Sequence, residues 1–345
     1  MSHTQRAVLV IGGTGFIGYH IVHSLLDEGC SVSVLCRDTR NAELLFDGKV
    51  HAIAGNVHEL HTSDYVTLLE GFTGVVFAAG VDERSKIEGN ADDFYYRNNI
   101  WPCEQLFNAL PETGVQHAVL LNSIFAWLDS QKPELGLTTH HAYIRSRVEQ
   151  NRVAHEAVHN STCILTTLQV PWIFGSSPHR ESQWQGLVNY VRGGVPVHCI
   201  NGSVNIMSVQ SLAQAVCGAL RYPVYSSTIP VGDYNMTHAE LMQAIAQCAG
   251  RPDVRVHILS DDFFRDILSL GSFFHDVFGL EAGLDMAHLP ELLLQDIVFD
   301  PVESQQLLHY AGGDWLQALQ ETVDTVDENP LMSGWRKWLN WIDKF

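Results

Sequence analysis

Near its start the chain carries the stretch Val8-Leu-Val-Ile-Gly12-Gly-Thr-Gly15-Phe-Ile-Gly18, in which a short apolar run leads into an amphipathic pattern. Gly12 can form the tight turn, Gly15 lets the backbone approach a pyrophosphate, and Gly18 lets helix and strand pack closely. The N-terminus of the helix then faces the anion. Strand, turn and helix together predict a dinucleotide-binding βαβ unit, and a purely structural turn is the alternative.

The next strand-like run, Ser31–Cys36, ends where dinucleotide sites contact the adenosine ribose. Sites that prefer NAD place an acidic residue there, which binds the 2′-hydroxyl. Here Cys36 is followed by Arg37, whose guanidinium can pair with a 2′-phosphate. We therefore predict NADP(H) as the preferred cofactor. NAD(H) is the alternative, in which Asp38 folds back onto the ribose.

Short apolar runs alternate with amphipathic helical patterns through the first half of the chain, and the helical patterns span 16–28, 95–110 and 143–158. Continuous apolar runs are typical of buried parallel strands. The pattern predicts an α/β fold, a Rossmann-type doubly wound parallel sheet with a smaller, mainly helical C-terminal substrate domain. The strand-like runs are Ala7–Ile11, Ser31–Cys36, Val50–Ala54, Val75–Ala79, Ala118–Asn122 and Cys163–Val170.

The alternation of strand-like and helical patterns ends after Gly175. A polar loop at 176–182 is followed by mostly helical patterns and one further strand-like run, Val204–Val209. We assign residues 1–175 to the dinucleotide-binding Rossmann domain and expect 201–232 to return to it. Residues 176–200 and 233–345 then form the substrate-binding, mainly helical part.

Composition excludes several classes of function. The 345 residues are 46% hydrophobic and 17% charged, and the net charge is −19. A nucleic-acid binder needs a basic surface, and an acidic chain is repelled by phosphate backbones and anionic lipid. No apolar run reaches the length of a membrane span. The seven cysteines form no CxxC pair, which favours reduced thiols and a cytoplasmic location. We expect a small-molecule substrate, with neither nucleic acid nor membrane as a partner.

A series of motifs resembles the extended short-chain dehydrogenase/reductase family, also called the NAD-dependent epimerase/dehydratase family, over nearly the whole chain. An arginine at position 37, after the second strand, makes the pattern more similar to the NADPH-dependent branch of dihydroflavonol reductases and their relatives. The landmarks besides the glycine loop are Gly55-Asn56-Val57, Phe77-Ala-Ala-Gly80, Asn99, Asn122-Ser123, Tyr143-Ile-Arg-Ser-Arg147 and Val170-Pro-Trp-Ile-Phe-Gly175.

This resemblance implies roles for four residues at the reaction centre. Tyr143 is the general acid/base for a carbonyl or alcohol oxygen, Ser123 holds the same oxygen, and Asn99 supports the local hydrogen-bond network. A tyrosine with an ordinary pKa near 10 needs a nearby cation to exchange protons at neutral pH. The family has a lysine four residues after the tyrosine, on the same helix face. This chain has Arg147 there instead.

Arg147 keeps the positive charge but cannot relay a proton. Three functions are therefore considered. We favour a working NADP(H)-dependent oxidoreductase that acts on a carbonyl or alcohol. The alternatives are an atypical member that binds NADP(H) as a sensor or scaffold without turnover, and a nucleotide-sugar epimerase or dehydratase. Asn56 is a further departure, because the family usually has Asp near the adenine.

The substrate pocket should be rich in aromatic residues, which favours an apolar or aromatic carbonyl compound. The predicted lining residues are Phe125, Trp127 and Phe174. The resemblance also implies a homodimer through the helices at 95–110 and 143–158. The expected cofactor contacts are Gly12, Thr14, Gly15, Phe16, Ile17, Gly18, Arg37, Asn56, Val57, Ala78, Ala79, Gly80, Tyr143, Arg147, Pro171, Trp172 and Ile173.

One motif is set aside. His155-Glu-Ala-Val-His159 matches the HExxH pattern of zinc proteases. It ends a helix directly before a buried strand, and a catalytic zinc needs a third protein ligand. Glu181 and His179 both lie beyond that strand. We predict no metal site.

Overall fold

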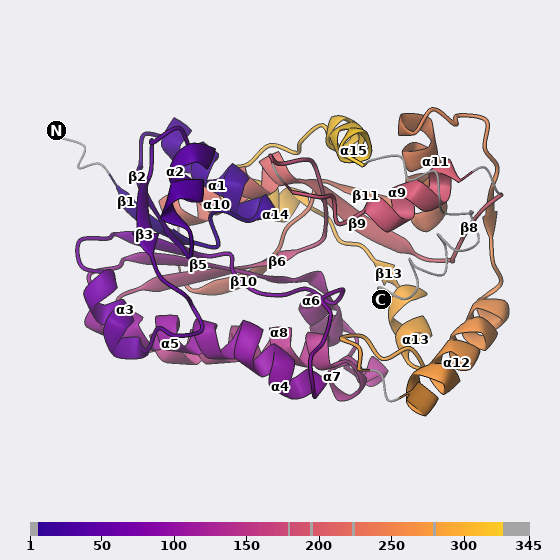
Figure 1. The fold of residues 1–345 in the computed structure, drawn as a ribbon, viewed down its shortest axis with the longest axis horizontal. Coiled ribbons are helices and arrows are strands. Elements are labelled where there is room, and N and C mark those ends of the chain that lie inside the picture. Colours follow the sequence, from indigo (N-terminus) through magenta and orange to yellow (C-terminus); the bar gives the residue numbers. More distant parts are fainter. Residues whose placement is uncertain (1–5, 179, 194–195, 223–224, 279–280, 327–345) are drawn as a thin grey trace.

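A parallel sheet of seven strands forms the centre of the fold (Figure 1). The computed structural model describes residues 6–178, 180–193, 196–222, 225–278 and 281–326. The strand order is β10-β6-β5-β4-β1-β2-β3 and every neighbouring pair is parallel, which confirms the predicted doubly wound sheet. The strands are β1 (Ala7–Ile11), β2 (Ser31–Cys36), β3 (His51–Ala54), β4 (Gly74–Phe77), β5 (His117–Ser123), β6 (Ile164–Val170) and β10 (Ser227–Pro230).

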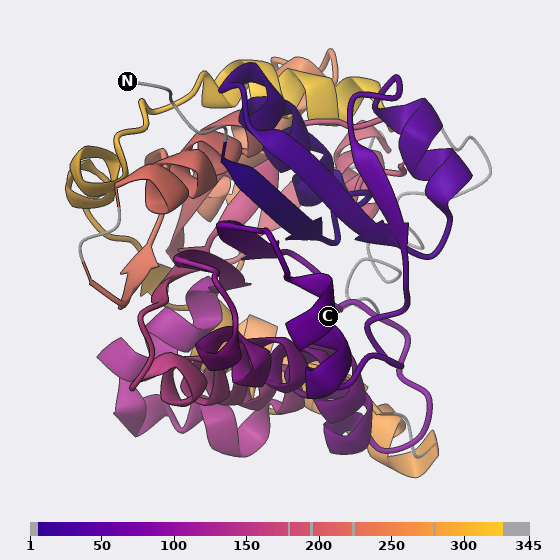
Figure 2. The same cartoon turned by 90° about the vertical axis from the view of Figure 1, so that its left-hand side faces the viewer.

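Helices cover both faces of this sheet. On one face the apolar stripe of α1, with Ile21 and Leu25 fully buried, packs against α10. On the other face α3, α5 and α8 pack over the strands, and Figure 2 shows the purple and magenta helices gathered there. The bounds are α1 (Phe16–Asp27), α2 (Thr39–Leu45), α3 (Thr62–Leu68), α5 (Trp101–Ala109), α6 (Ile124–Gln131), α7 (Leu137–His140), α8 (Ala142–Val158) and α10 (Val209–Arg221), with short 3₁₀ turns at 110–112 and 133–135.

The predicted helix over 95–110 is not uniform. It consists of α4 (Ala91–Tyr95), a π-helical turn (Tyr96–Ile100) and then α5. A π-helical turn adds a residue to one turn and redirects the side chains beside it, and such turns are frequent at functional sites. Asn99 lies within this turn and is fully buried.

The second part of the molecule contains more β-structure than the sequence predicts. A four-stranded sheet has the order β11-β9-β13 with β7 paired to β9, and β8 pairs with β12. Its strands are short, so their apolar runs are hard to recognise. The elements are β7 (Trp172–Phe174), α9 (Gln185–Arg192), β8 (Val197–Cys199), β9 (Ser203–Ser208), β11 (Tyr234–Thr237), α11 (His238–Cys248), β12 (Val256–Ile258), α12 (Asp261–Phe278), α13 (Leu289–Leu293), β13 (Asp296–Ile297), α14 (Val302–Leu308) and α15 (Trp315–Asp324).

The chain passes between the two sheets more than once. After β9 it returns through α10 and β10, which pairs with β6 at the edge of the large sheet. It then leaves again through β11, which pairs with β9. Within the described residues, no helix combines the length and the apolar character that crossing a membrane requires.

Candidate functional site

The glycine loop lies between β1 and α1 and fits a dinucleotide. Gly12 has φ +86°, and a Cβ there would lie 2.6 Å from the carbonyl oxygen of Ala78. At Gly18 a Cβ would lie 2.1 Å from the carbonyl oxygen of Gly12, so helix and loop touch backbone to backbone. No side chain caps the N-terminus of α1. Its N–H groups therefore remain available to an anion, as a pyrophosphate site requires.

A cavity of about 460 Å³ extends from this loop along the carboxyl ends of β4, β5 and β6. Ligands of doubly wound sheets bind in this position. The predicted site residues that line it are Gly15, Phe16, Ile17, Gly18, Ala78, Ala79, Gly80, Ser123, Phe125, Tyr143, Arg147, Pro171, Trp172 and Ile173.

Tyr143 lies in the first turn of α8 and is 6% exposed. Burial raises the pKa of its phenol to about 12, and the Glu83 carboxylate contributes in the same direction. The Arg147 guanidinium and the Ser123 hydroxyl lower this pKa. The phenol is therefore protonated at neutral pH and can donate a proton.

Arg147 follows one helical turn later, with its guanidinium 6.0 Å from the centre of the Tyr143 ring. Its Nη2 donates to the carbonyl oxygen of Leu121 at 2.8 Å, and the side chain is 8% exposed. Its Nε is buried and has no hydrogen-bond partner within the described residues. Burying an unsatisfied donor costs roughly 1–3 kcal/mol. The arginine thus has an N–H group near Tyr143 that no described residue satisfies.

Asn99 does not line the cavity but holds its wall. Its Oδ1 accepts from the Val81 backbone N–H at 2.8 Å, and its Nδ2 donates to the Val81 carbonyl oxygen at 3.2 Å and to Ser146 Oγ at 3.3 Å. The π-helical turn aims this amide at the loop that follows β4. Asn99 therefore fixes the position of that loop.

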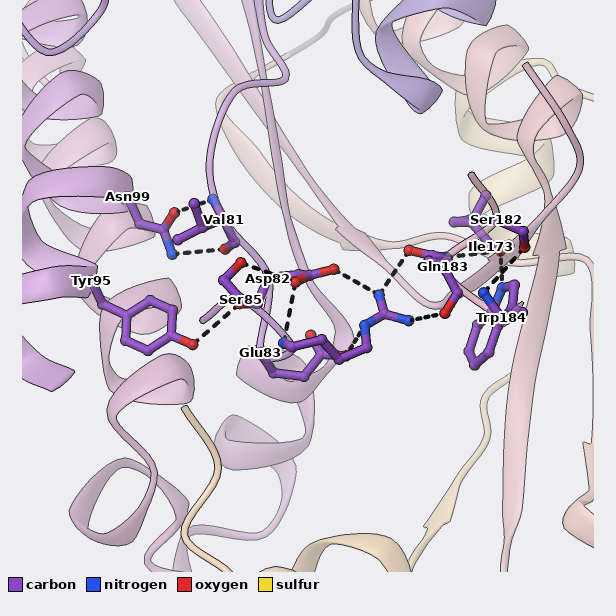
Figure 3. Close-up of polar contacts among 11 residues, drawn as sticks. Val81, Asp82, Glu83, Ser85, Tyr95, Asn99, Ile173, Ser182, Gln183 and Trp184 are labelled. Atoms are coloured by element: carbon purple, nitrogen blue, oxygen red, sulfur yellow. Dashed lines mark hydrogen bonds and ion pairs between the residues drawn. The ribbon is translucent and has the colours of Figure 1, made fainter. Parts of the chain in front are cut away.

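The loop at 81–85 carries charged residues and follows shortly after β4, a strand that ends at the cavity. Asp82, Glu83 and Arg84 all line the cavity, and Figure 3 shows Asp82 and Glu83 between Tyr95 and Gln183. Arg84 Nη2 lies 2.8 Å from Asp82 Oδ2 and 2.7 Å from Gln183 Oε1. Its guanidinium also lies over the Trp184 ring at 5.4 Å. Arg84 thereby joins this loop to the start of α9.

Two of the residues predicted to line the substrate pocket, Trp127 and Phe174, do not line this cavity. Trp127 packs against Phe299, with ring centres 5.4 Å apart. Phe174 is 1% exposed and stacks on Trp184 at 4.8 Å in the core of the second part. Their aromatic character reflects core packing, and of the three predicted residues only Phe125 lines the cavity.

The residues predicted for the adenosine end lie outside this cavity. Arg37 is exposed directly after β2. Asp38 caps α2, because its Oδ1 accepts from the Asn41 backbone N–H at 3.1 Å. Asn56 follows β3, and its Nδ2 donates to Glu59 Oε1 at 2.8 Å.

Three other predicted cofactor contacts, Gly12, Thr14 and Val57, are also not among the residues that line the cavity. Val57 is half-buried against the core on the α5 face. Gly12 forms the turn itself, and Thr14 offers its carbonyl oxygen to Arg180 Nη2 at 3.1 Å.

The HExxH histidine His155 serves a structural purpose. Its Nε2 lies 3.1 Å from Thr167 Oγ1 and 3.2 Å from Thr228 Oγ1, next to the edge of the sheet. Within the part of the chain that the structure describes, no three His, Cys, Asp or Glu side chains gather as metal ligands. His179, one of the third ligands considered, lies outside the described residues.

Comparison with known proteins connects this geometry to a family. Residues 12–186 match the model of a family described as NAD(P)H-binding. UDP-glucose 4-epimerase 3 of Oryza sativa subsp. japonica is 26% identical over 137 residues, a match that spans only 36% of each protein.

Solved structures resemble the chain over nearly its full length. They include gox2253 (TM-score 0.75, 17% identity, 93% of this chain and 98% of that one). UDP-glucose 4-epimerase of Thermotoga maritima, solved with UDP-glucose, has TM-score 0.65 and 15% identity over 96% and 99% of the two chains. UDP-glucuronic acid 4-epimerase of Bacillus cereus, solved with UDP-glucuronic acid and NAD, has TM-score 0.65 and 14% identity over 92% and 99%. At such identities the likeness shows the fold.

Proposed function

The chain belongs to the NAD(P)H-binding family, and on this premise we propose that it is an NADP(H)-dependent oxidoreductase acting on a carbonyl or an alcohol. The resemblance to the epimerase/dehydratase family is confirmed, whereas the dihydroflavonol-reductase branch stays a prediction. The observation that carries the proposal is the meeting of Ser123, Tyr143 and Arg147 in one cavity with the glycine loop.

The glycine loop would hold the pyrophosphate, and Arg147 would face the nicotinamide ribose. When bound, the cofactor supplies or takes up a hydride. Tyr143 donates a proton to the oxygen of the carbonyl, and Ser123 orients the same oxygen. Because the raised pKa keeps the Tyr143 phenol protonated, the protein without cofactor is poised for reduction.

Two observations support NADP(H) over NAD(H). Arg37 is exposed at the end of β2, where a 2′-phosphate would lie. Asp38, the residue that would bind a 2′-hydroxyl, is instead engaged as the cap of α2. The carboxylate would have to give up that cap to reach a ribose.

NADPH oxidation against a panel of aldehydes and ketones tests the proposal, with the wild type compared with Tyr143→Phe. We expect turnover in the wild type and its loss in the variant, with NADPH binding retained by both. Tight NADPH binding without turnover of any compound would favour a sensor or scaffold.

Nucleotide-sugar epimerisation is the second candidate, because two of the similar solved structures are such enzymes. Three arginines line the cavity, Arg84, Arg147 and Arg180, and guanidinium groups could pair with a diphosphate. Arg84 is already paired with Asp82. Chromatography of UDP-glucose incubated with the protein checks this candidate. Conversion to UDP-galactose, with a cofactor that stays bound and is recycled, would replace the reductase proposal.

We also propose a cytoplasmic homodimer formed through the helical segments at 95–110 and 143–158. The mass in solution, measured by light scattering, tests the dimer. Substitution of the exposed Tyr96 by Glu at the predicted interface should then yield monomers.

A further inference from the structure

The Glu83 carboxyl is a buried acidic group that the proposed reaction does not use. It lines the same cavity as Tyr143, Ser123 and Arg147, and its side chain is only 15% exposed. Removing a carboxylate from water is costly unless hydrogen bonds or charges compensate it. A buried carboxyl group in a cavity of this kind is a candidate for a functional role.

The surrounding contacts hold Glu83 rigidly. Asn99 makes two hydrogen bonds to the Val81 backbone, and Tyr95 Oη donates to the Asp82 carbonyl oxygen at 3.2 Å. From the other side Gly283 is wedged against the loop, since a Cβ there would lie 2.1 Å from Tyr95 Oη and 3.0 Å from the Glu83 carbonyl oxygen. Figure 3 shows this loop between Tyr95 and the start of α9. The backbone that carries the Glu83 side chain is therefore held in place.

Its two neighbours in sequence are satisfied within the protein. Asp82 Oδ1 accepts from the Arg84 backbone N–H and from Ser85 Oγ, while its Oδ2 accepts from Arg84 Nη2. The Glu83 carboxyl, in contrast, receives no hydrogen bond from another described residue. Arg84 Nε lies 3.4 Å away, in an orientation that leaves this N–H unsatisfied. Glu83 thus retains free hydrogen-bonding capacity toward the cavity.

We propose that Glu83 determines specificity by binding a hydroxyl group of the substrate next to the reacting carbonyl carbon. The inference rests on the proposed function, and it replaces a purely apolar substrate with a hydroxyketone or, in the reverse direction, a vicinal diol. A hydroxyl group both donates and accepts, so it satisfies the carboxyl in either protonation state. Burial raises the pKa of Glu83. An apolar analogue would leave the carboxyl without a hydrogen bond from the substrate and is therefore bound less tightly.

The test compares 2-hydroxycyclohexanone with cyclohexanone in the NADPH assay. We expect wild-type kcat/KM to be roughly 10- to 100-fold higher for the hydroxyketone, since an unpaired buried polar group costs about 1–3 kcal/mol. Glu83→Leu should abolish this preference, and Glu83→Gln, which keeps hydrogen-bonding capacity, should retain part of it. Glu88→Gln, an exposed residue beyond the same loop, is the matched control. An unchanged preference in a folded Glu83→Leu variant would overturn the inference.

A binding measurement separates this inference from the proposed function. Calorimetry on the protein–NADP⁺ complex should show trans-1,2-cyclohexanediol binding about tenfold more tightly than cyclohexanol, with the difference lost in Glu83→Leu. Absence of turnover together with this binding preference would refute the reductase and keep the role of Glu83. Equal affinities for the two alcohols in the wild type would refute the role of Glu83 whatever the turnover. Thermal unfolding of each variant confirms that it is folded.

Discussion

The two ends of the cavity are built in different ways. At the cofactor end, the loop at 12–18 and the start of α1, the backbone itself forms the site, and the space at Gly18 excludes even a methyl group. At the reaction end, Ser123, Tyr143, Arg147 and the loop at 81–85, side chains form the site. Backbone geometry leaves a fixed glycine spacing in the sequence, while side chains that meet from distant elements do not. The cofactor end can therefore be recognised from the sequence more readily than the proposed reaction end.

The largest effect is expected at the reaction end. Tyr143→Phe removes the proton donor while keeping the ring that packs on Tyr95. Turnover should fall roughly 10²- to 10⁴-fold, the usual contribution of a general acid. Steady-state NADPH oxidation measures the loss, and fluorescence titration should show unchanged NADPH affinity. Equal turnover in both proteins would place the proton donor elsewhere.

At the cofactor end Gly18→Ala should weaken NADPH binding roughly 10- to 100-fold. The added Cβ must push apart helix and loop, and overpacking of this kind typically costs about 1–3 kcal/mol. Isothermal titration measures the affinity. Gly114→Ala is the control, because a Cβ there meets nothing within 4 Å. Similar affinities for the two variants would contradict a backbone-built site.

Arg37→Ala sharpens the cofactor assignment. We expect NADPH affinity to fall about tenfold and NADH affinity to change little, because a charge-assisted hydrogen bond to a 2′-phosphate contributes roughly 1.5–3 kcal/mol before solvent screening. Arg255→Ala, another exposed arginine far along the chain, controls for net charge. Tighter wild-type binding of NADH than of NADPH would reverse the assignment.

The smallest effects concern pH. Alcohol oxidation needs Tyr143 as the phenolate, so its rate should rise as pH approaches the raised pKa, about 12 without cofactor. Arg147→Met removes a charge that lowers this pKa, and the alkaline rise should move to higher pH by roughly one pH unit. Glu83→Gln removes a charge that raises it, so the rise should move to lower pH. Shifts of the same sign in both variants would contradict the electrostatic assignment.

Strong local patterns allowed much of the fold to be predicted from sequence. β1 and β2 coincide with their apolar runs, and α1 ends one residue before the predicted boundary. β10 was not predicted because it is short, two of its four residues (Ser-Thr-Ile-Pro) are polar, and it lies at the sheet edge. The π-helical turn at Tyr96–Ile100 was also not predicted, because an inserted residue within a single turn affects too few positions to be recognised in the apolar pattern.

The candidate site, like the fold, could be predicted from the sequence only in part. Residues adjoining strand ends, such as Ser123 and Ala78, reach the cavity because parallel strands all end on one side. Trp127 and Phe174 lie four residues beyond the ends of β5 and β6, and their side chains pack against other aromatic rings. Sequence position fixes the end of a strand, whereas the direction of a side chain beyond it depends on tertiary packing. The role of Arg84 depends on Gln183, 99 residues away, and no local pattern reports that contact.

The return of the chain through α10 and β10 has a consequence for synthesis on the ribosome. The apolar face of α1, with Ile21 and Leu25, is covered by α10 about 190 residues later. The first βαβ unit therefore leaves the ribosome with this apolar face exposed, although its own strands can already pair. The face is covered only after residue 221, the last residue of α10, has left the exit tunnel. During that interval the nascent chain should be a substrate for chaperones, and a fragment ending at residue 175 should aggregate instead of folding as an independent dinucleotide-binding domain.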